Sequence, residues 1–581
     1  MSINGKTFII GVYCLISAPI FAQTAYLELS LNNQAIHNRI STARSQSPLE
    51  LIRVINRAAK DKRIQGIIIN AAGFYANQEY MWELRAALSE FKSGGKKICA
   101  FISAADLDLY CLASVADKIV MDEQGILNPA GYAWGRGYVQ HTLDKLGIGV
   151  QEMRYLKYKS AMEMFVRDSI SDEDRIQYGE WLDDIYSVTK DIVVNARSWE
   201  PDKFDEVLNN GFMYSAKDAL RQGLVDYIGR EDAVKKAINE LEGSEVKYFV
   251  CSGDLNTSLS GSKSHYGPGK AGGFFRQPPV IAVVYANGQT DMEQGMAARS
   301  LSKTIRKISE NKQVKAIVLR IDSPGGSAEA ADYIAEAVKY AKKKIPVVVS
   351  MGSVAASGGY WAAMYANEII ASPYTLTGSV GVIGSWFYDK GLNQKLGFTV
   401  DVLQRGDHAD LATGIILPRR NLNTVEAERY RQLLMDIYED FVAKVAAGRN
   451  MDIEKVEAIA QGRVYSGLGA FNAGLIDKIG GLGDAVNSAR ILAGIPEDKK
   501  IAFAEFPKPK FLDKMLMRLS KQSVQQFAYA SQTNGSTALS DASLLLDLLV
   551  SEQMRSDLIY RIAHNGQIMP ILPVDYSRLP R

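Results

Sequence analysis

The feature that most constrains this chain is that its sequence is written twice. Four segments of the first half recur in the same order in the second half, displaced by 247 to 251 residues. The matches are "RIQGIIIN" (63–70) with "QVKAIVLR" (313–320), "KKICAFIS" (96–103) with "KKIPVVVS" (343–350), "YCLASVADKIVM" (110–121) with "YWAAMYANEIIA" (360–371), and "MYSAKDALRQGLVDYIG" (213–229) with "VYSGLGAFNAGLIDKIG" (464–480). Four ordered matches at nearly one offset are hard to obtain by chance, so we expect two copies of one folding unit.

Each copy alternates short β-branched runs with helical patterns, which predicts α/β units built around a largely parallel sheet. We expect an N-terminal copy at 48–250, a Ser/Gly-rich linker at 252–278 and a C-terminal copy at 279–500. Residues 501–581 match neither copy, and their amphipathic segments predict a helical tail.

The first 22 residues contain one Lys before an apolar stretch, which predicts a signal peptide or a membrane anchor. The formal net charge of +2 gives no basic field for nucleic acid. The four cysteines lack the spacing of a metal site or a disulfide framework. We therefore expect an exported chain with no metal and no nucleic-acid partner.

A serine lies among small residues where a strand of the second copy should end. The stretch "SMGSVAASGGYW" (350–361) follows an apolar run, and Ser357 has Ala355 and Gly359 two positions to either side. This arrangement is typical of a nucleophile turn, in which a hydroxyl projects from a tight strand-to-helix connection. It also suits a helix packed close to a sheet, with Ser357 capping the turn. Ser353 is expected only to shape the turn.

The repeat separates these interpretations. At an offset of 250, Ser357 falls opposite Leu107, whereas Lys159 of the first copy falls opposite Ala409. If the copies are halves of one site, one supplies a hydroxyl and the other an amine, which are the parts of a Ser-Lys dyad. Lysine acts as a base only when its pKa is lowered from about 10.4. His408 is the alternative base, in a Ser-His pair within one copy.

Paired glycines accompany the serine. "SPGG" (323–326) of the second copy faces "AAGF" (71–74) of the first. Glycine permits the close approach that oxyanion donors need, so the N–H groups of Gly326 and Gly358 are the candidates. Tyr360 and Trp361 are expected to pack in the core rather than to bind substrate.

With these residues in view, the chain resembles the signal peptide peptidase A (SppA) family, in its long two-repeat type. The matching stretches are "IDSPGGSAEAADYI", "SMGSVAASGGYWAAMYANEIIASPYTLTGSVGVIG" and "LKYKSAMEMFVRDSIS". The resemblance implies a Clp protease/crotonase fold, Ser357 as nucleophile, Lys159 as proton donor and acceptor, and Ser379 as the residue that orients the lysine.

The resemblance further implies a homotetramer on the periplasmic side of the bacterial inner (plasma) membrane. Its substrates would be remnants of cleaved signal peptides, and the chemistry needs no cofactor. Two other functions are compatible with the residues. A crotonase-type acyl-CoA enzyme shares the glycine-lined oxyanion hole but needs no serine, and a non-enzymatic membrane scaffold needs neither member of the dyad.

Overall fold

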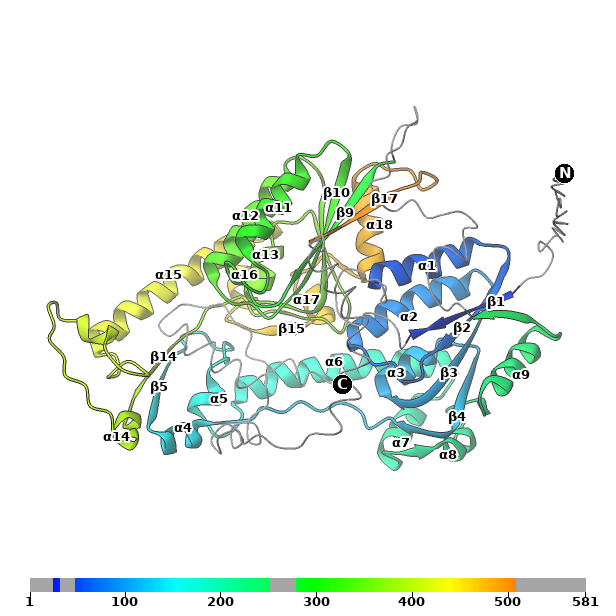
Figure 1. Ribbon diagram of the computed structural model, residues 1–581, viewed down its shortest axis with the longest axis horizontal. Helices are drawn as coiled ribbons and strands as arrows, with labels where there is room; N and C mark the ends of the chain where they lie inside the picture. Colours follow the sequence, from blue (N-terminus) through cyan, green and yellow to red (C-terminus); the bar gives the residue numbers. More distant parts are fainter. Residues whose placement is uncertain (1–24, 32–46, 251–277, 508–581) are drawn as a thin grey trace, which may run out of the picture.

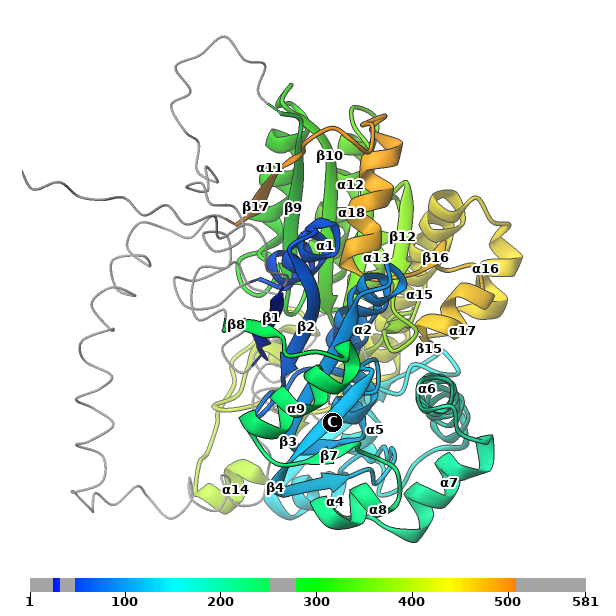
Figure 2. The same ribbon diagram turned by 90° about the vertical axis from the view of Figure 1, so that its right-hand side faces the viewer.

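The computed structural model of the protein describes residues 25–31, 47–250 and 278–507. Within these residues two α/β units lie side by side, each built on a mostly parallel sheet (Figures 1 and 2). The predicted fold class, a tandem duplication of one α/β unit, is confirmed. The expected signal or anchor segment, nearly all of the linker and the tail helices lie outside the described residues. None of the described helices is long and apolar enough to cross a membrane.

The first sheet has seven strands, in the order β6-β4-β3-β2-β1-β8 with β7 beside β4. Its strands are β1 (Ala25–Ser30), β2 (Ile64–Asn70), β3 (Lys97–Asp106), β4 (Lys118–Asn128), β6 (Tyr214–Ser215), β7 (Tyr227–Ile228) and β8 (Lys247–Val250). The helices of this copy are α1 (Pro48–Lys60), α2 (Gln78–Ser93), α3 (Leu107–Ala113), α4 (Gln140–Leu146), α5 (Glu163–Val166), α6 (Asp172–Arg197), α7 (Pro201–Asn210), α8 (Ala216–Arg221) and α9 (Glu231–Glu242).

The second sheet has eight strands, in the order β15-β13-β11-β10-β9-β17 with β12 and β16 attached. Its strands are β9 (Val280–Asn287), β10 (Val314–Ser323), β11 (Val347–Ala356), β12 (Glu368–Ala371), β13 (Leu376–Gly378), β15 (Val464–Ser466), β16 (Lys478–Ile479) and β17 (Ala502–Phe506). Its helices are α11 (Ala298–Ser309), α12 (Ala328–Lys342), α13 (Gly358–Ala363), α14 (Leu392–Leu396), the 3-10 helix η3 (Ala409–Ala412), α15 (Thr424–Arg449), α16 (Ile453–Ile459), α17 (Gly467–Asn472) and α18 (Leu482–Leu492).

The duplication is visible in the strand register as well as in the strand order. β1 to β4 pair in parallel in the first copy, and β9 to β11 pair in parallel in the second. β11 is buried along its whole length. A parallel sheet covered on both faces has continuous apolar strands, which is why these segments carried the strongest sequence signal.

Two strands lie outside the boundaries that the sequence suggested for the copies. β1 precedes residue 48 and pairs with β2 and β8, whereas β17 falls in the segment expected to be a helical tail and pairs with β9. Both are short and come without a matching repeat signal. Their place is set by pairing with a distant strand, which a local pattern does not report.

A buried ion cluster joins the two copies. Arg320 of β10 is fully buried and donates to Glu83 of α2 at 2.7 Å and to Ser350 at 2.7 Å. It also pairs at 2.5 Å with Glu79 of α2. Since removing one member of this ion cluster leaves a buried charge unpaired, the cluster should hold the copies in a fixed register.

Ser353 adds to the contact that this ion cluster makes between the copies. It was expected to shape a turn, but it lies within β11 and accepts a 2.8 Å hydrogen bond from Asn77, so that expectation was wrong.

The protonation of this cluster can be tested with Glu83→Gln. Burial raises the pKa of Glu83 to about 8. Between about pH 4.5 and pH 8, a carboxyl with this raised pKa keeps its proton in the folded chain but has lost it in the unfolded chain. Its contribution to stability is therefore present at acid pH and is lost as the pH rises through 8, at up to about 1.4 kcal/mol per pH unit. We expect the free energy of unfolding of Glu83→Gln, measured in urea from pH 5 to 9, to gain on the wild type as the pH rises. Parallel curves would contradict this.

The long helix α6 forms a second contact between the copies. Although it belongs to the first copy, it runs beneath β15 of the second (Figure 1). Its Tyr178, Trp181 and Ile185 are buried in one cluster with side chains of β11, β13 and β15, namely Val354, Ala356, Leu376 and Val464, together with Tyr374. The two contacts together make the boundary between the copies a packed interior, and the candidate site lies at this boundary.

Candidate active site

Ser357 occupies the turn between β11 and α13. Its backbone has φ 55° and ψ −115°, a conformation that non-glycine residues rarely adopt. The turn is fixed from both sides, because the Ser357 N–H donates to the carbonyl of Gly378 at 2.8 Å and Trp361 N–H donates to the Ser357 carbonyl at 2.8 Å. Strain of this kind is found where a hydroxyl must project from a strand-to-helix turn.

The surrounding glycines explain why small residues are needed. A Cβ on Gly358 would lie 2.6 Å from Thr290 Oγ1, and one on Gly359 would lie 2.7 Å from the carbonyl of Ser323. Neither space admits a side chain. The "AASGG" pattern is therefore a steric requirement of the turn that presents Ser357.

Lys159 reaches this turn from the other copy. β5 (Ile148–Met153) of the first copy pairs antiparallel with β14 (Gly384–Asp389) of the second, and the lysine segment follows β5 directly. The Tyr158 N–H then donates to the carbonyl of Gln461 at 2.9 Å. Gly462 permits this approach, since a Cβ there would lie 2.6 Å from Lys159 Cβ. Main-chain pairing between the copies thus delivers the lysine.

The structure brings together the three residues that the sequence and the resemblance singled out for acid-base chemistry. Lys159 Nζ lies 2.7 Å from Ser357 Oγ, 2.9 Å from Ser379 Oγ and 2.9 Å from the Ser379 carbonyl oxygen. All three side chains are fully buried. Ser379 also has a positive φ of 52°, and its N–H donates to the Arg463 carbonyl. This backbone conformation points both the hydroxyl and the carbonyl of Ser379 at the lysine.

Burial sets the charge of the lysine. Desolvation lowers the pKa of Lys159 well below the usual value of 10.5. Among the residues that the structure describes, no carboxylate forms an ion pair with it. A lysine without a counter-ion in a dry site favours its neutral form, which is the form that can accept a proton.

A buried polar network lies behind the lysine segment, and the sequence analysis did not find it. Arg136 pairs with Asp174 at 2.7 Å and donates to the Ser160 carbonyl at 3.1 Å. Gln177 of α6 donates to Asp174 at 2.6 Å and to the Tyr158 carbonyl at 3.2 Å, and its oxygen accepts from the N–H of Val464 at 3.0 Å. Gln177 therefore ties the lysine segment to β15. In the sequence, the only sign of this network is that polar residues such as Asp174 and Gln177 fall on the buried face of a predicted helix.

The two oxyanion candidates lie close together beside Thr290. Gly326 has φ 150° and forms an isolated parallel bridge with Thr290, through the carbonyl of Gly325 and the N–H of Ser327. The Gly326 N–H itself takes no part in that bridge. Gly358 is the first residue of α13, where an N–H has no partner within the helix. The role of both N–H groups stays a prediction.

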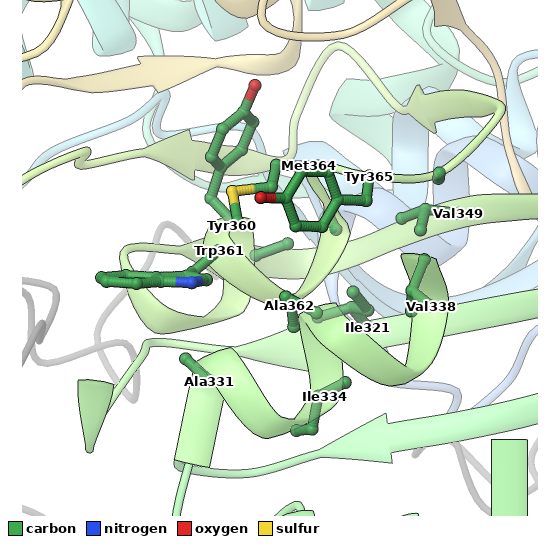
Figure 3. Close-up of a cluster of buried hydrophobic side chains, with 14 of the residues drawn as sticks. Ile321, Ala331, Ile334, Val338, Val349, Tyr360, Trp361, Ala362, Met364 and Tyr365 are labelled. Carbon is green, nitrogen blue, oxygen red and sulfur yellow. The ribbon is translucent and has the colours of Figure 1, made fainter. Parts of the chain in front are cut away.

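The alternative base and the aromatic pair are placed elsewhere. His408 is exposed and its Nδ1 lies 2.7 Å from Glu426 Oε1, so it contacts a carboxylate rather than Ser357. Tyr360 donates to the Leu475 carbonyl at 2.8 Å, and Trp361 stacks on Phe441 with ring centroids 4.1 Å apart. Figure 3 shows both aromatic side chains among the core residues next to α12. The expectation that they pack in the core is confirmed.

Ser379→Ala tests whether the Ser379 hydroxyl supports the lysine. The change removes one of the acceptors of Lys159 and leaves the Ser379 carbonyl in place. Losing a hydrogen bond to a group that becomes charged costs about 1.5 to 3 kcal/mol, so we expect kcat/KM to fall by about 10- to 100-fold. Because this acceptor stabilises the ammonium form, the acid limb of the pH–rate profile should also move to lower pH. An unchanged profile would assign Ser379 a purely structural role.

Comparison with known proteins identifies the family. The model for peptidase family S49 matches residues 90–245 and 339–496, once in each copy, and the model for Clp protease matches residues 285–371. Serine protease SPPA, chloroplastic, from Arabidopsis thaliana is 33% identical over 461 residues, or 78% of this chain and 67% of that protein. Protease 4 from Salmonella typhi is 33% identical over 469 residues, or 78% and 73%. Protease 4 from Haemophilus influenzae is 30% identical over 494 residues, or 81% and 76%.

Among solved structures, a ClpP1 variant from Listeria monocytogenes overlaps 35% of this chain and 94% of its own, with 18% identity and a TM-score of 0.24. The sequence matches confirm the resemblance inferred from the motifs, since they place the same peptidase domain on both repeats. The chain belongs to peptidase family S49, and it is a serine peptidase with two copies of the family's domain.

Proposed function

We propose that Ser357 and Lys159 form a Ser-Lys dyad that hydrolyses internal bonds of hydrophobic peptides, in particular the remnants of cleaved signal peptides. The observation that carries the proposal is the 2.7 Å contact between Ser357 Oγ and the buried amine of Lys159. The amine is in hydrogen-bond reach of the proton it must take. The substrate class rests on the resemblance to the signal peptide peptidase family. The match to peptidase family S49 favours a peptidase over the two alternatives, a crotonase-type acyl-CoA enzyme and a non-enzymatic membrane scaffold.

In the first half of the reaction the dyad breaks the peptide bond. Neutral Lys159 takes the proton of Ser357 Oγ while that oxygen bonds to the substrate carbonyl carbon. The carbonyl oxygen then carries the negative charge, and the N–H groups of Gly326 and Gly358 would donate to it. When the intermediate collapses, the carbon–nitrogen bond breaks and the Lys159 ammonium gives its proton to the leaving amine.

The second half of the reaction frees the enzyme. A water molecule attacks the Ser357 ester, and Lys159 takes a proton from this water. Collapse breaks the ester bond, returns the proton to Ser357 Oγ and releases the carboxyl product. Ser379 would hold the amine on the line to Ser357 in both halves, because its two oxygens lie 2.9 Å from Nζ.

For the setting of this activity we propose a membrane-associated homo-oligomer, a tetramer, on the periplasmic side of the bacterial inner membrane. The apolar stretch within residues 1–22 supports export or anchoring. A substrate that is itself released within a membrane would favour an enzyme held close to it.

The test uses the full-length chain in a mild non-ionic detergent, with a hydrophobic signal-sequence peptide and a charged peptide of equal length. We expect cleavage within the apolar stretch of the first peptide, slower cleavage of the second, and covalent labelling of Ser357 by a fluorophosphonate, located by peptide mapping. Labelling of a different serine, or no cleavage of either peptide, would overturn the assignment of the dyad. Equal cleavage of both peptides would overturn the substrate class alone.

A further inference from the structure

Thr290 lies between the two glycines that are the candidates for the oxyanion hole. It is fully buried, in the segment that follows β9. A Cβ placed on Gly326 would lie 2.8 Å from Thr290 Oγ1, and one placed on Gly358 would lie 2.6 Å from the same atom. The two glycines belong to different turns, one after β10 and one after β11. One hydroxyl group therefore lies against both turns.

The main chain of Thr290 sets the direction of the Gly326 N–H. The Thr290 N–H donates to the Gly325 carbonyl at 2.8 Å, and the Thr290 carbonyl accepts from the Ser327 N–H at 2.7 Å. In such a parallel bridge, the residue between the two partners turns its own N–H and carbonyl to the opposite side. The Gly326 N–H is therefore directed away from Thr290, as a donor to a substrate oxygen must be.

The Thr290 hydroxyl is not explained by stability. Among the residues that the structure describes, its one hydrogen bond is the 3.3 Å bond to the Ser327 carbonyl, which is long. That carbonyl already accepts from the Ala331 N–H at 3.0 Å, in the first turn of α12. A valine has nearly the same shape and would avoid the cost of burying a hydroxyl with a single long hydrogen bond. The position of the hydroxyl beside both glycines is what remains to be explained.

The segment that carries Thr290 is itself fixed. The Met296 N–H donates to the Gln289 carbonyl at 3.0 Å, which closes residues 290–295 into a loop. Within the loop, Asp291 Oδ1 accepts from two backbone N–H groups, each at 2.8 Å. Thr290 is thus a rigid support for the two turns that lie against it.

Two N–H groups stabilise one oxygen only if both are correctly placed. Each donor must lie about 2.7 to 3.1 Å from the position of the developing oxyanion. Gly326 and Gly358 lie on separate turns, and a misplacement of about 1 Å in an active site can cost about 100-fold in rate. A side chain that lies against both turns fixes their separation.

We propose that Thr290 is a positioning residue of the oxyanion hole, whose hydroxyl group holds the turns of Gly326 and Gly358 at the separation that two donors to one oxygen need. Thr290 acts through the two glycines and does not itself contact the substrate. The inference rests on the proposed Ser-Lys mechanism, and it adds the residue that arranges the oxyanion donors of that mechanism.

The first measurement is kcat and KM of the full-length chain on the hydrophobic signal-sequence peptide. Thr290→Val removes the hydroxyl and keeps the shape, whereas Thr290→Ser keeps the hydroxyl and removes the methyl group. The oxyanion forms only in the transition state, so Thr290→Val should lower kcat about tenfold or more and change KM by less than about twofold. Thr290→Ser should retain kcat within about threefold of the wild type.

Thr375→Val is the matched control. Thr375 is also a fully buried threonine of the second copy, but its hydroxyl donates to the Gly352 carbonyl at 2.8 Å, a shorter bond than that of Thr290. We therefore expect Thr375→Val to lower the urea midpoint of unfolding and to keep kcat within about twofold of the wild type. Thr290→Val should show the reverse, with a smaller change in the midpoint and a large change in kcat.

A peptide aldehyde provides a second measurement, which depends on the oxyanion site. Its carbonyl carbon bonds to Ser357 Oγ, the serine proton passes to Lys159, and the carbonyl oxygen takes the negative charge. The peptide alcohol of the same sequence binds without forming this bond. Thr290→Val should raise the inhibition constant of the aldehyde about tenfold and leave that of the alcohol unchanged.

Each contrary result has a distinct meaning. Unchanged kcat in Thr290→Val would overturn the inference, and so would a rise in KM at unchanged kcat, because Thr290 would then bind substrate. An equal loss of kcat in Thr290→Ser would overturn the role of the hydroxyl. If the wild type is neither inhibited by the aldehyde nor labelled at Ser357 by a fluorophosphonate, the proposed mechanism fails and the inference fails with it. A wild type that passes both tests beside an unaffected Thr290→Val would remove the inference alone.

Discussion

Replacing Ser357 with alanine is expected to lower peptidase activity by about 10⁴-fold or more, because a dyad without its nucleophile retains only the residual catalysis of binding and oxyanion donors. The fold should tolerate the change. Ser357 Oγ contacts Lys159 at 2.7 Å and the Gly381 carbonyl at 3.5 Å, and its backbone bonds do not involve the side chain. Alanine has the same difficulty with a positive φ as serine, so the free energy of unfolding should change by less than about 1 kcal/mol.

Ser353→Ala is the matched control for this prediction. Ser353 lies four residues earlier, within β11, but its hydroxyl accepts from Asn77 of the first copy rather than facing the lysine. The control variant should keep full labelling and lose about 1 kcal/mol of stability. The measurement is kcat/KM on the hydrophobic peptide together with fluorophosphonate labelling. Retained activity in Ser357→Ala would mean that another group, such as Ser379, attacks the substrate.

The proposed catalytic pair could be predicted from the sequence because the repeat supplied a reference residue for each position. Ser357 and Lys159 stand out only when each is compared with the residue in the other copy, since serine among small residues and a lysine between apolar residues are individually common. The parallel strands were accessible for a different reason. They are buried on both faces, so their composition follows from their place in the sheet.

The remainder of the site depends on contacts between distant segments. Gly462 lies against Lys159 Cβ, and Gln177 links the Tyr158 carbonyl to the N–H of Val464. In the sequence, however, the pattern around Gly462 predicts only a turn, and the pattern around Gln177 predicts only a helix. The strand pairing of β5 with β14, which delivers the lysine, joins segments about 236 residues apart without any repeat signal. Nothing in a local pattern specifies such a partner, because strand pairing is determined by the assembled structure.

Lys159→Met is the second change with a large expected effect, and it separates catalysis from folding. Methionine has a similar length and no basic nitrogen, so activity should fall by about 10³-fold or more. Lys157→Met is the matched control, since Lys157 is an exposed neighbour in the same segment and should be dispensable. In the wild type, kcat/KM should rise with pH through the lowered pKa of Lys159, because only the neutral amine takes the serine proton. Full activity in the methionine variant would exclude the dyad.

The Lys159→Met substitution should change stability in the opposite sense to activity, and this follows from the same lowered pKa. In the unfolded chain Lys159 binds a proton below about pH 10.5, whereas the buried amine of the folded chain stays neutral down to its lowered pKa. Between these two values the unfolded state binds one more proton, so the wild type loses up to about 1.4 kcal/mol of stability for each pH unit that the pH falls. Methionine has no such titration. The difference in free energy of unfolding between Lys159→Met and the wild type, measured in urea from pH 10 to 6, should therefore increasingly favour the variant as the pH falls. A constant difference would show that the lysine is charged in the folded protein, and the neutral base that the mechanism requires would then be absent.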